Sequence, residues 1–217
     1  MPFINLHTHQ YTADPEILEV VNQYPWEFSA KIPQYSIGIH PWYIKEDRLS
    51  SDLQLIEEKL KDEKCLALGE CGLDKRIEIP LSLQTEVFQQ QIELVQQTTK
   101  PIILHCVAAY QELIAIKKEM DIQNPMIVHG FSKNEQVAKS LLDNGLYLSF
   151  GKYLLRNPDL EKVFKFVPEN CFFLETDTIE EGIAQVYQKA ATVKNLTVEQ
   201  LQQQVIQNFE AVFKRNK

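Results

Sequence analysis

The sequence has little of what marks several classes of protein. It holds only 7 glycines among its 217 residues, and no apolar stretch approaches the roughly 20 residues that a transmembrane helix needs. Its first residues carry neither the basic nor the apolar region of a signal peptide. Like charges do not gather in blocks, and 44% of the residues are hydrophobic, which excludes a disordered chain. We therefore expect one domain over residues 1–217, in the cytoplasm and without membrane contact.

Cysteines are also few, and the 22 basic residues are outnumbered by 30 acidic ones. The four cysteines, Cys65, Cys71, Cys106 and Cys171, show no C-x-x-C spacing, and each lies in or beside an apolar run. This pattern predicts reduced, buried thiols rather than disulfides or a zinc ribbon. The net charge of −8 argues against nonspecific nucleic-acid binding through a basic face. It leaves room for a nucleic-acid enzyme whose bound metal ions supply the positive charge.

Short apolar runs alternate with amphipathic helical stretches along the whole chain. Runs such as residues 102–104 (IIL) are typical of parallel strands that are buried on both faces. The predicted strands are residues 3–7, 26–29, 35–39, 65–70, 101–105, 125–129, 146–150 and 171–175. Eight strands alternating with helices predict an α/β fold, a TIM-like (β/α)8 barrel. The segment from His9 to Tyr35 is short, so we expect an abbreviated second βα unit.

An open doubly wound sheet is the competing architecture. No G-x-G-x-x-G or G-x-x-x-x-G-K-[ST] loop follows any predicted strand, which disfavours it. Helix starts are expected where a cap residue precedes Glu or Gln by three positions, at Ser51, Ser132 and Thr197. Asn157 before Pro158 predicts another helix start.

All five histidines fall at the carboxyl ends of predicted strands. They are His7, His9, His40, His105 and His129, and Glu70 and Asp177 lie at the ends of two further strands. In a (β/α)8 barrel this end carries the active site. Imidazoles and carboxylates are common ligands of divalent ions that act in hydrolysis. The arrangement predicts a metal site, and a solvated polar rim is the alternative.

The motifs around these residues resemble those of the TatD family of metal-dependent deoxyribonucleases, within the wider amidohydrolase-like barrels. The motifs are NLHTH at residues 5–9, GIHP at 38–41, GECGLD at 69–74, LHC at 104–106, HGFS at 129–132 and ETD at 175–177. They occur in the order of the family. The resemblance implies a divalent-metal-dependent hydrolase that cleaves phosphodiester bonds of DNA or an oligonucleotide.

The resemblance also implies a role for each motif residue. It assigns two divalent ions, one held by His7, His9 and Asp177, the other by His105 and His129, with Glu70 bridging them. Asp177 and Glu70 are the implied catalytic residues, Asp177 by orienting a water activated by the ions and accepting its proton, with Glu175 in support. His40 and Arg156 are the implied substrate contacts. The identity of the ions stays open among magnesium, manganese, zinc and nickel.

Four roles keep alternatives. His40 is either a substrate contact or a structural histidine of the rim. Asp74 is either an orienting partner or the cap of the following loop, and Ser132 is a helix cap or an anion contact. Arg156 is equally well a solvated surface arginine. A monomer is compatible with the sequence, which does not fix the oligomeric state.

The sequence departs from the family pattern around the expected substrate. Val107 stands where the family usually has an arginine, and the chain runs from Asp177 almost directly into a helix, without the family's substrate-facing loop. A small-molecule hydrolase acting on an amide, lactone or phosphoester is therefore a second hypothesis. A non-catalytic binding protein on the same barrel is a third.

Overall fold

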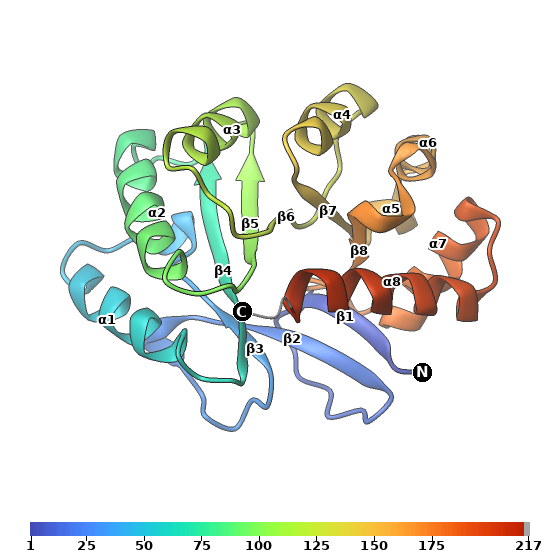
Figure 1. Ribbon diagram of the computed structural model, residues 1–217, viewed down its shortest axis with the longest axis horizontal. Helices are drawn as coiled ribbons and strands as arrows, with labels where there is room; N and C mark the ends of the chain where they lie inside the picture. The colour runs from blue at the N-terminus through green and yellow to red at the C-terminus, as the bar shows by residue number, and fades with distance from the viewer. Residues whose placement is uncertain (215–217) are drawn as a thin grey trace. The chain divides into compact units, whose positions relative to one another are not determined.

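The computed structural model describes residues 1–214, and its strands form one eight-stranded sheet in chain order (Figure 1). The strands are β1 (Phe3–Thr8), β2 (Ile17–Gln23), β3 (Tyr35–Ile37), β4 (Cys65–Asp74), β5 (Ile102–Val107), β6 (Met126–Val128), β7 (Tyr147–Phe150) and β8 (Phe172–Leu174). A further parallel bridge joins Thr8 to Asp177, just beyond β8. Eight parallel strands with helices between them confirm the predicted (β/α)8 fold class.

The helices follow the third and later strands. They are α1 (Leu49–Lys59), α2 (Leu81–Val95), α3 (Tyr110–Glu119), α4 (Glu135–Asp143), α5 (Lys152–Arg156), α6 (Pro158–Phe166), α7 (Ile183–Lys194) and α8 (Val198–Phe213). Three short 3₁₀ turns complete the elements: η1 (Pro25–Glu27), η2 (Pro41–Tyr43) and η3 (Glu169–Cys171). In residues 9–34, which the structure describes throughout, no α-helix follows β1 or β2. The second βα unit is abbreviated as predicted, and the first lacks its helix as well.

The predicted second strand was wrong. Residues 26–29 do not pair; Pro25, which has no N–H to donate, begins the turn η1 there. The strand lies earlier, at Ile17–Gln23, in register with β1. Glu19 interrupts the apolar run and hides it from a hydrophobicity pattern. Its buried carboxylate accepts hydrogen bonds from the Thr12 N–H (2.9 Å) and hydroxyl (3.1 Å), which compensate for its burial.

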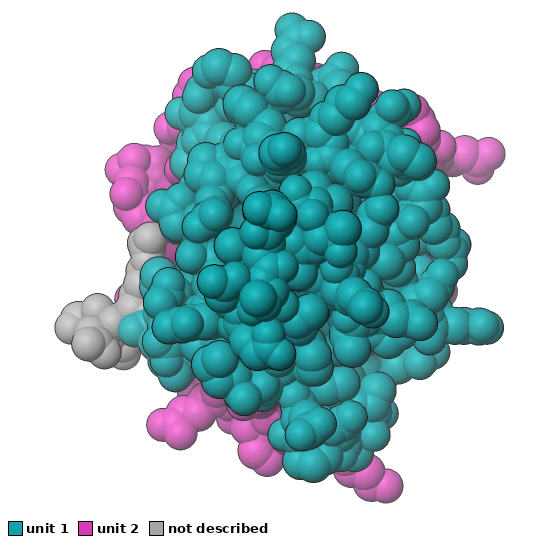
Figure 2. All heavy atoms as spheres, turned by 90° about the vertical axis from the view of Figure 1, so that its right-hand side faces the viewer, with its two compact units in different colours: residues 1–21, 127–216 teal, residues 22–126, 217 magenta. Residues whose placement is uncertain are grey.

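The described residues divide into two compact units, coloured separately in Figure 2. The first unit comprises residues 1–21 and 127–214, and the second comprises residues 22–126. One domain over residues 1–217 stays a prediction, and its last three residues lie outside the described ones.

In the first unit, α7 and α8 pack against β1 and β8. The buried Tyr187 hydroxyl of α7 donates to the Ile4 carbonyl (3.0 Å) and accepts from the Ile4 N–H (3.1 Å). The buried Asn208 amide of α8 donates to the carbonyls of Glu169 (2.7 Å) and Phe172 (2.9 Å). Each helix is thus tied to a strand by a buried polar side chain as well as by apolar packing.

In the second unit, α2 packs against β4. Its fully buried apolar residues, Val87, Phe88, Ile92 and Val95, recur at helical spacing on one face. This confirms the helix expected from the sequence pattern.

Two predicted helix caps are confirmed and two were wrong. Thr197 forms a complete capping box with Gln200, and Asn157 caps α6 ahead of Pro158. The cap of α4 is Asn134 rather than Ser132, because the Asn134 side chain accepts from the Val137 N–H (3.1 Å). Helix α1 begins at Leu49, two residues before Ser51, whose hydroxyl donates to the Arg48 carbonyl instead.

The four cysteines are free thiols, as predicted. Cys65, Cys71 and Cys106 are buried, and Cys171 is half-buried. Burial raises the pKa of the Cys65 and Cys106 thiols to about 12, so both stay protonated at neutral pH. Among residues 1–214, we find no helix with the length and apolarity required to cross a membrane.

Candidate metal centre

In the first unit, the candidate ligands come from the carboxyl ends of three strands. His7 lies in β1 and is fully buried, His9 follows β1, His129 follows β6 and Asp177 follows β8. The parallel sheet brings these strand ends to one edge. The sequence prediction that they gather is therefore met within this unit for His7, His9, His129 and Asp177.

The main chain of Asp177 is fixed between the two histidines of β1. Its N–H donates to the His7 carbonyl (2.9 Å), and its carbonyl accepts from the His9 N–H (3.1 Å). The residue has φ +55°, a left-handed conformation that is uncommon for a side chain other than glycine but that aspartate tolerates. Two backbone bonds hold this strained conformation, and together they set the direction of the carboxylate.

Asn5 and Thr176 fasten the same segment from inside the unit. The Asn5 amide donates to the Thr176 hydroxyl (2.9 Å), and its carbonyl oxygen accepts from the Thr176 N–H (3.0 Å). Both residues are buried. Asn5 begins the NLHTH motif, which predicts no role for it; in the structure it holds in place Thr176, the residue that precedes Asp177.

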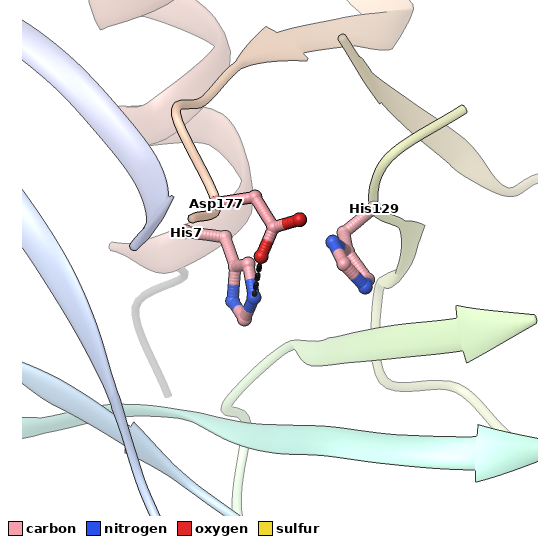
Figure 3. A group of neighbouring side chains, drawn as sticks. All are labelled: His7, His129 and Asp177. Carbon is pink, nitrogen blue, oxygen red and sulfur yellow. Dashed lines mark ion pairs between the residues drawn. The ribbon is translucent and has the colours of Figure 1, made fainter. Parts of the chain in front are cut away.

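The side-chain spacing around Asp177 fits ligands of a single ion. Asp177 Oδ1 lies 3.5 Å from His9 Nε2 and 3.8 Å from His7 Nε2, longer than ordinary hydrogen bonds. Two ligands at about 2.1 Å from a tetrahedral ion lie about 3.4 Å apart. The ligand atoms of His7, His129 and Asp177 all lie within 4.8 Å of one another, and Figure 3 shows their side chains converging.

His129 is oriented by a buried carboxylate. Its Nδ1 lies 3.3 Å from Glu175 Oε1, which also accepts from the Gly130 N–H (2.8 Å). With Nδ1–H donated to Glu175, Nε2 is the nitrogen available to a metal. Burial opposes ionisation of Glu175, but the neighbouring His129 outweighs it and holds the pKa of this carboxyl below its usual range.

In the second unit, Glu70 joins two histidines. Glu70 Oε1 lies 3.1 Å from His40 Nε2 and 3.0 Å from His105 Nδ1, and the ligand atoms of the three residues lie within 4.8 Å of one another. His40 Nδ1 accepts from the Trp42 N–H (3.1 Å), so its proton is on Nε2 and is donated to Glu70. The Glu70 main chain is held as well, because its N–H donates to Asn22 Oδ1 (2.7 Å).

Asp74 orients His105 and is more than a loop cap. Its Oδ2 accepts from Trp42 Nε1–H (2.8 Å) and lies 3.1 Å from His105 Nε2, while Oδ1 accepts from the Arg76 N–H (2.8 Å). Burial opposes ionisation of Asp74, but these bonds outweigh it and hold the pKa of the carboxyl below its usual range. The ionised carboxylate fixes Nε2–H of His105 and leaves Nδ1 directed at Glu70.

Two buried glutamines of α2 hold the main chain beside these residues. Gln84 accepts from the Asp74 N–H (2.8 Å) and donates to the Asp74 carbonyl (3.0 Å). Gln91 accepts from the Ile39 N–H (2.7 Å) and donates to the Ile39 carbonyl (3.2 Å), next to His40. Helix α2 therefore positions both ends of the group through its polar side chains.

Close approach of β4 to β5 depends on Gly72. Its φ of +136° is available to glycine, and a Cβ there would come within 2.1 Å of the His105 carbonyl oxygen. The glycine of the GECGLD motif thus lets the His105 main chain lie against β4.

Arg156 forms an ion pair with an acidic residue of its own unit. It ends α5 with a half-exposed side chain, and its Nη2 donates to both carboxylate oxygens of Glu181 (2.8 and 3.0 Å). The two residues line a surface depression of about 410 Å³ with Glu180 and Gln185. Helix α7 begins at Ile183, so the segment after Asp177 is short, as expected from the sequence.

Comparison with known proteins agrees with the motifs. The profile of the family described as "TatD related DNase" matches residues 3–214. The uncharacterized metal-dependent hydrolase YabD of Bacillus subtilis is 29% identical over 216 residues, covering 92% of this chain and 82% of YabD. The uncharacterized metal-dependent hydrolase YcfH of Escherichia coli is 29% identical over 196 residues, covering 82% of this chain and 73% of YcfH.

A solved structure supports the same fold. The crystal structure of YjjV, a TatD homologue from Escherichia coli, superposes with a TM-score of 0.83 over 99% of this chain and 98% of YjjV, at 20% identity. This likeness concerns the barrel, whereas the profile match over nearly the whole chain concerns the family. The chain belongs to the TatD family of metal-dependent hydrolases.

Proposed function

We propose that this chain hydrolyses phosphodiester bonds of DNA or oligonucleotides with the help of bound divalent ions. The observation that carries the proposal is that Asp177 Oδ1 lies 3.5 Å from His9 Nε2 and 3.8 Å from His7 Nε2, a spacing that suits ligands of one ion. The family profile, which is described as DNase, supports the substrate class.

Six residues are our proposed ligands. In the first unit, His7, His9, His129 and Asp177 would be ligands, and in the second unit Glu70 and His105 would be ligands. Their donor set of imidazole nitrogens and carboxylate oxygens suits zinc, manganese, nickel or magnesium. When bound, divalent ions lower the pKa of water toward neutrality and offset the charge of a phosphodiester.

Asp177 is the proposed general base. Its side chain is 29% exposed, whereas Glu70 and Glu175 are almost fully buried, so Asp177 is the carboxylate that water reaches. Its backbone bonds to His7 and His9 keep the carboxylate in a fixed direction as it accepts the proton. Glu175 and Asp74 hold the rings of His129 and His105 without touching the substrate.

The proposed substrate contacts each require an exchange of partner. His40 donates to Glu70, and Arg156 is bound to Glu181. A phosphate that engages Arg156 must therefore displace a carboxylate of the same charge. We keep both residues as proposed substrate contacts, with Arg156 bearing the greater cost.

A small-molecule hydrolase is the second candidate, and the Arg156–Glu181 pair favours it. In this pair Glu181 neutralises a cation that would otherwise bind a polyanion. Val107, which stands where the family usually has an arginine, supplies no positive charge. The same ligands would then serve a lactone, an amide or a small phosphoester.

The test is cleavage of an end-labelled single-stranded oligonucleotide with magnesium, manganese and zinc in parallel. Asp177→Asn should lower the rate at least about 100-fold, since an amide cannot accept the proton. The metal content of this variant should fall by a smaller factor than its rate. Asp143→Asn, an exposed aspartate of α4 paired with Lys139, is the matched control and should cleave like the wild type.

Two results would change the assignment. Full activity of Asp177→Asn would remove the general-base role. No cleavage by wild-type protein that demonstrably binds metal would overturn the nuclease proposal, and activity on a panel of lactones, amides and phosphomonoesters would then support the second candidate.

A further inference from the structure

Trp42 exposes a large aromatic side chain beside the histidines of the second unit. It lies in η2, directly after His40 and Pro41, and is 52% exposed. Its ring centroid lies 5.1 Å from that of His40 and 5.7 Å from that of His105. The interplanar angles are 85° and 74°, so neither histidine stacks face to face on the indole.

The exposed indole is nevertheless fixed in orientation. Its Nε1–H donates to Asp74 Oδ2 (2.8 Å), and its backbone N–H donates to His40 Nδ1 (3.1 Å). Both acceptors belong to the hydrogen-bonded group around Glu70. An exposed aromatic ring anchored through its polar edge presents its face at little cost in conformational entropy.

The other tryptophan shows what a structural role looks like in this unit. Trp26 is stacked on Tyr24, with centroids 4.8 Å apart and planes 7° apart. The Arg48 guanidinium lies 3.6 Å from the centroid of the Trp26 ring. The Trp26 ring thus has a ring and a guanidinium on its faces, whereas among residues 1–214 the ring contacts of Trp42 are edge contacts and half of its surface is exposed.

We propose that Trp42 is a stacking platform for a nucleobase of the substrate next to the bond that is cut. The inference rests on the proposed function and specifies it: the enzyme would recognise a chain that carries bases, rather than the sugar-phosphate backbone alone. Stacking suits a substrate of variable sequence, because every base has an aromatic face. It also supplies affinity that does not depend on cationic side chains, in a protein whose net charge is −8.

Fluorescence provides a direct binding test that does not require turnover. The chain has two tryptophans, so a Trp26→Phe variant leaves Trp42 as the sole indole emitter. This variant, carrying Asp177→Asn to stop cleavage and loaded with zinc, is titrated with a single-stranded oligonucleotide and with an abasic chain of the same number of phosphates. We expect saturable quenching with the oligonucleotide and none with the abasic chain at equal concentration.

A substitution series separates stacking from positioning. Trp42→Leu and Trp42→Ala should weaken oligonucleotide binding roughly 10- to 100-fold and leave abasic binding unchanged. Trp42→Phe keeps a ring but loses the bond to Asp74, so it should bind within about threefold of the wild type. Its zinc content shows whether His105 has moved. Phe166→Leu is the matched control, since Phe166 is 40% exposed in the last turn of α6 and should have no effect.

Two results would overturn the platform. One is equal quenching by base-containing and abasic chains; the other is wild-type affinity of Trp42→Leu for the oligonucleotide. If wild-type protein still cleaves oligonucleotides with metal, the proposed function stands without this platform. Base-dependent quenching in a protein that cleaves no phosphodiester would retain the platform and remove the proposed function.

Discussion

The two units position their candidate ligands by different means. In the first unit, main-chain bonds place Asp177 between His7 and His9, and its carboxylate stays 3.5 to 3.8 Å from their rings. In the second unit, side chains bond directly to one another, with His40 and His105 both 3.0 to 3.1 Å from Glu70.

This difference bears on how ions bind. The first group has the spacing of ligands around an ion and needs little rearrangement. In the second group His40 donates its Nε2–H to Glu70, so this hydrogen bond must be broken or the ring turned before Glu70 binds a metal through that oxygen. We infer that the ligands around Asp177 bind an ion more readily than those around Glu70. Before an ion binds there, Asp74 and Trp42 hold the His105 ring in its orientation.

The largest expected effect comes from removing the hydrogen bonds between Asn5 and Thr176 in the first unit. Asn5→Leu leaves the buried Thr176 N–H without its acceptor, which should lower the free energy of unfolding by about 2 kcal/mol. It should also displace Asp177 and abolish most metal-dependent activity. Urea denaturation and zinc content measure the two effects.

Asn144→Ala is the matched control for this change. Asn144 is a half-buried asparagine of the same unit, and its amide donates to the Ser140 carbonyl (2.8 Å). It should cost less than about 1 kcal/mol and leave zinc content unchanged. If Asn5→Leu behaves like this control, main-chain positioning of Asp177 is not what distinguishes the first group.

The next effect tests side-chain positioning in the second unit. Asp74→Asn loses an acceptor needed by Trp42, His105 and the Arg76 N–H together, so we expect about a 10-fold loss in metal affinity or in kcat/KM. Titration of the protein with zinc and steady-state kinetics measure it.

Asp62→Asn is the control, because Asp62 likewise accepts from a side chain, the Tyr35 hydroxyl (3.1 Å), and from a backbone N–H, that of Lys64 (2.9 Å). It precedes β4, at the opposite end of that strand from Asp74. Equal losses in both variants would show that Asp74 acts only through stability.

The smallest effect is expected away from both groups. Thr197→Ala breaks the capping box of α8 and should cost about 1 kcal/mol of stability, with activity per folded molecule unchanged. Thr192→Ala, which removes an exposed hydroxyl bonded to the Gln188 carbonyl within α7, should be nearly neutral. A loss of activity in Thr197→Ala at full folding would mean that α8 contributes to ligand placement.

The sequence predicted much of this fold because strands covered on both faces are written as apolar runs. Seven of the eight described strands were located in this way. The histidines at their carboxyl ends were recognised as site candidates because this end of a (β/α)8 barrel carries the active site. Strand β2 was missed because Glu19 interrupts its run of apolar residues. The hydrogen bond from Thr12, which is seen in the structure, explains how the Glu19 carboxylate can be buried.

The site was predictable as a set of residue types but not as a set of bonds. His7, His9, Glu70, His105, His129 and Asp177 were named from their motifs. The roles of Asn5, Gln84, Gln91 and Trp42 depend on contacts between residues far apart in the chain, which no local pattern records. Helix caps show the same limit: Ser132 and Asn134 are both good caps, and the turn geometry selected Asn134.

We expect His9 and His105 to serve different divalent ions, and the metal content of single and double variants measures this. Wild type, His9→Ala, His105→Ala and the double variant are dialysed against zinc or manganese and analysed for bound metal, with Asp143→Asn as the control. Two equivalents are expected in the wild type and the control, one in each single variant and none in the double variant. Wild-type protein without bound metal, or a double variant with its full complement, would contradict this expectation.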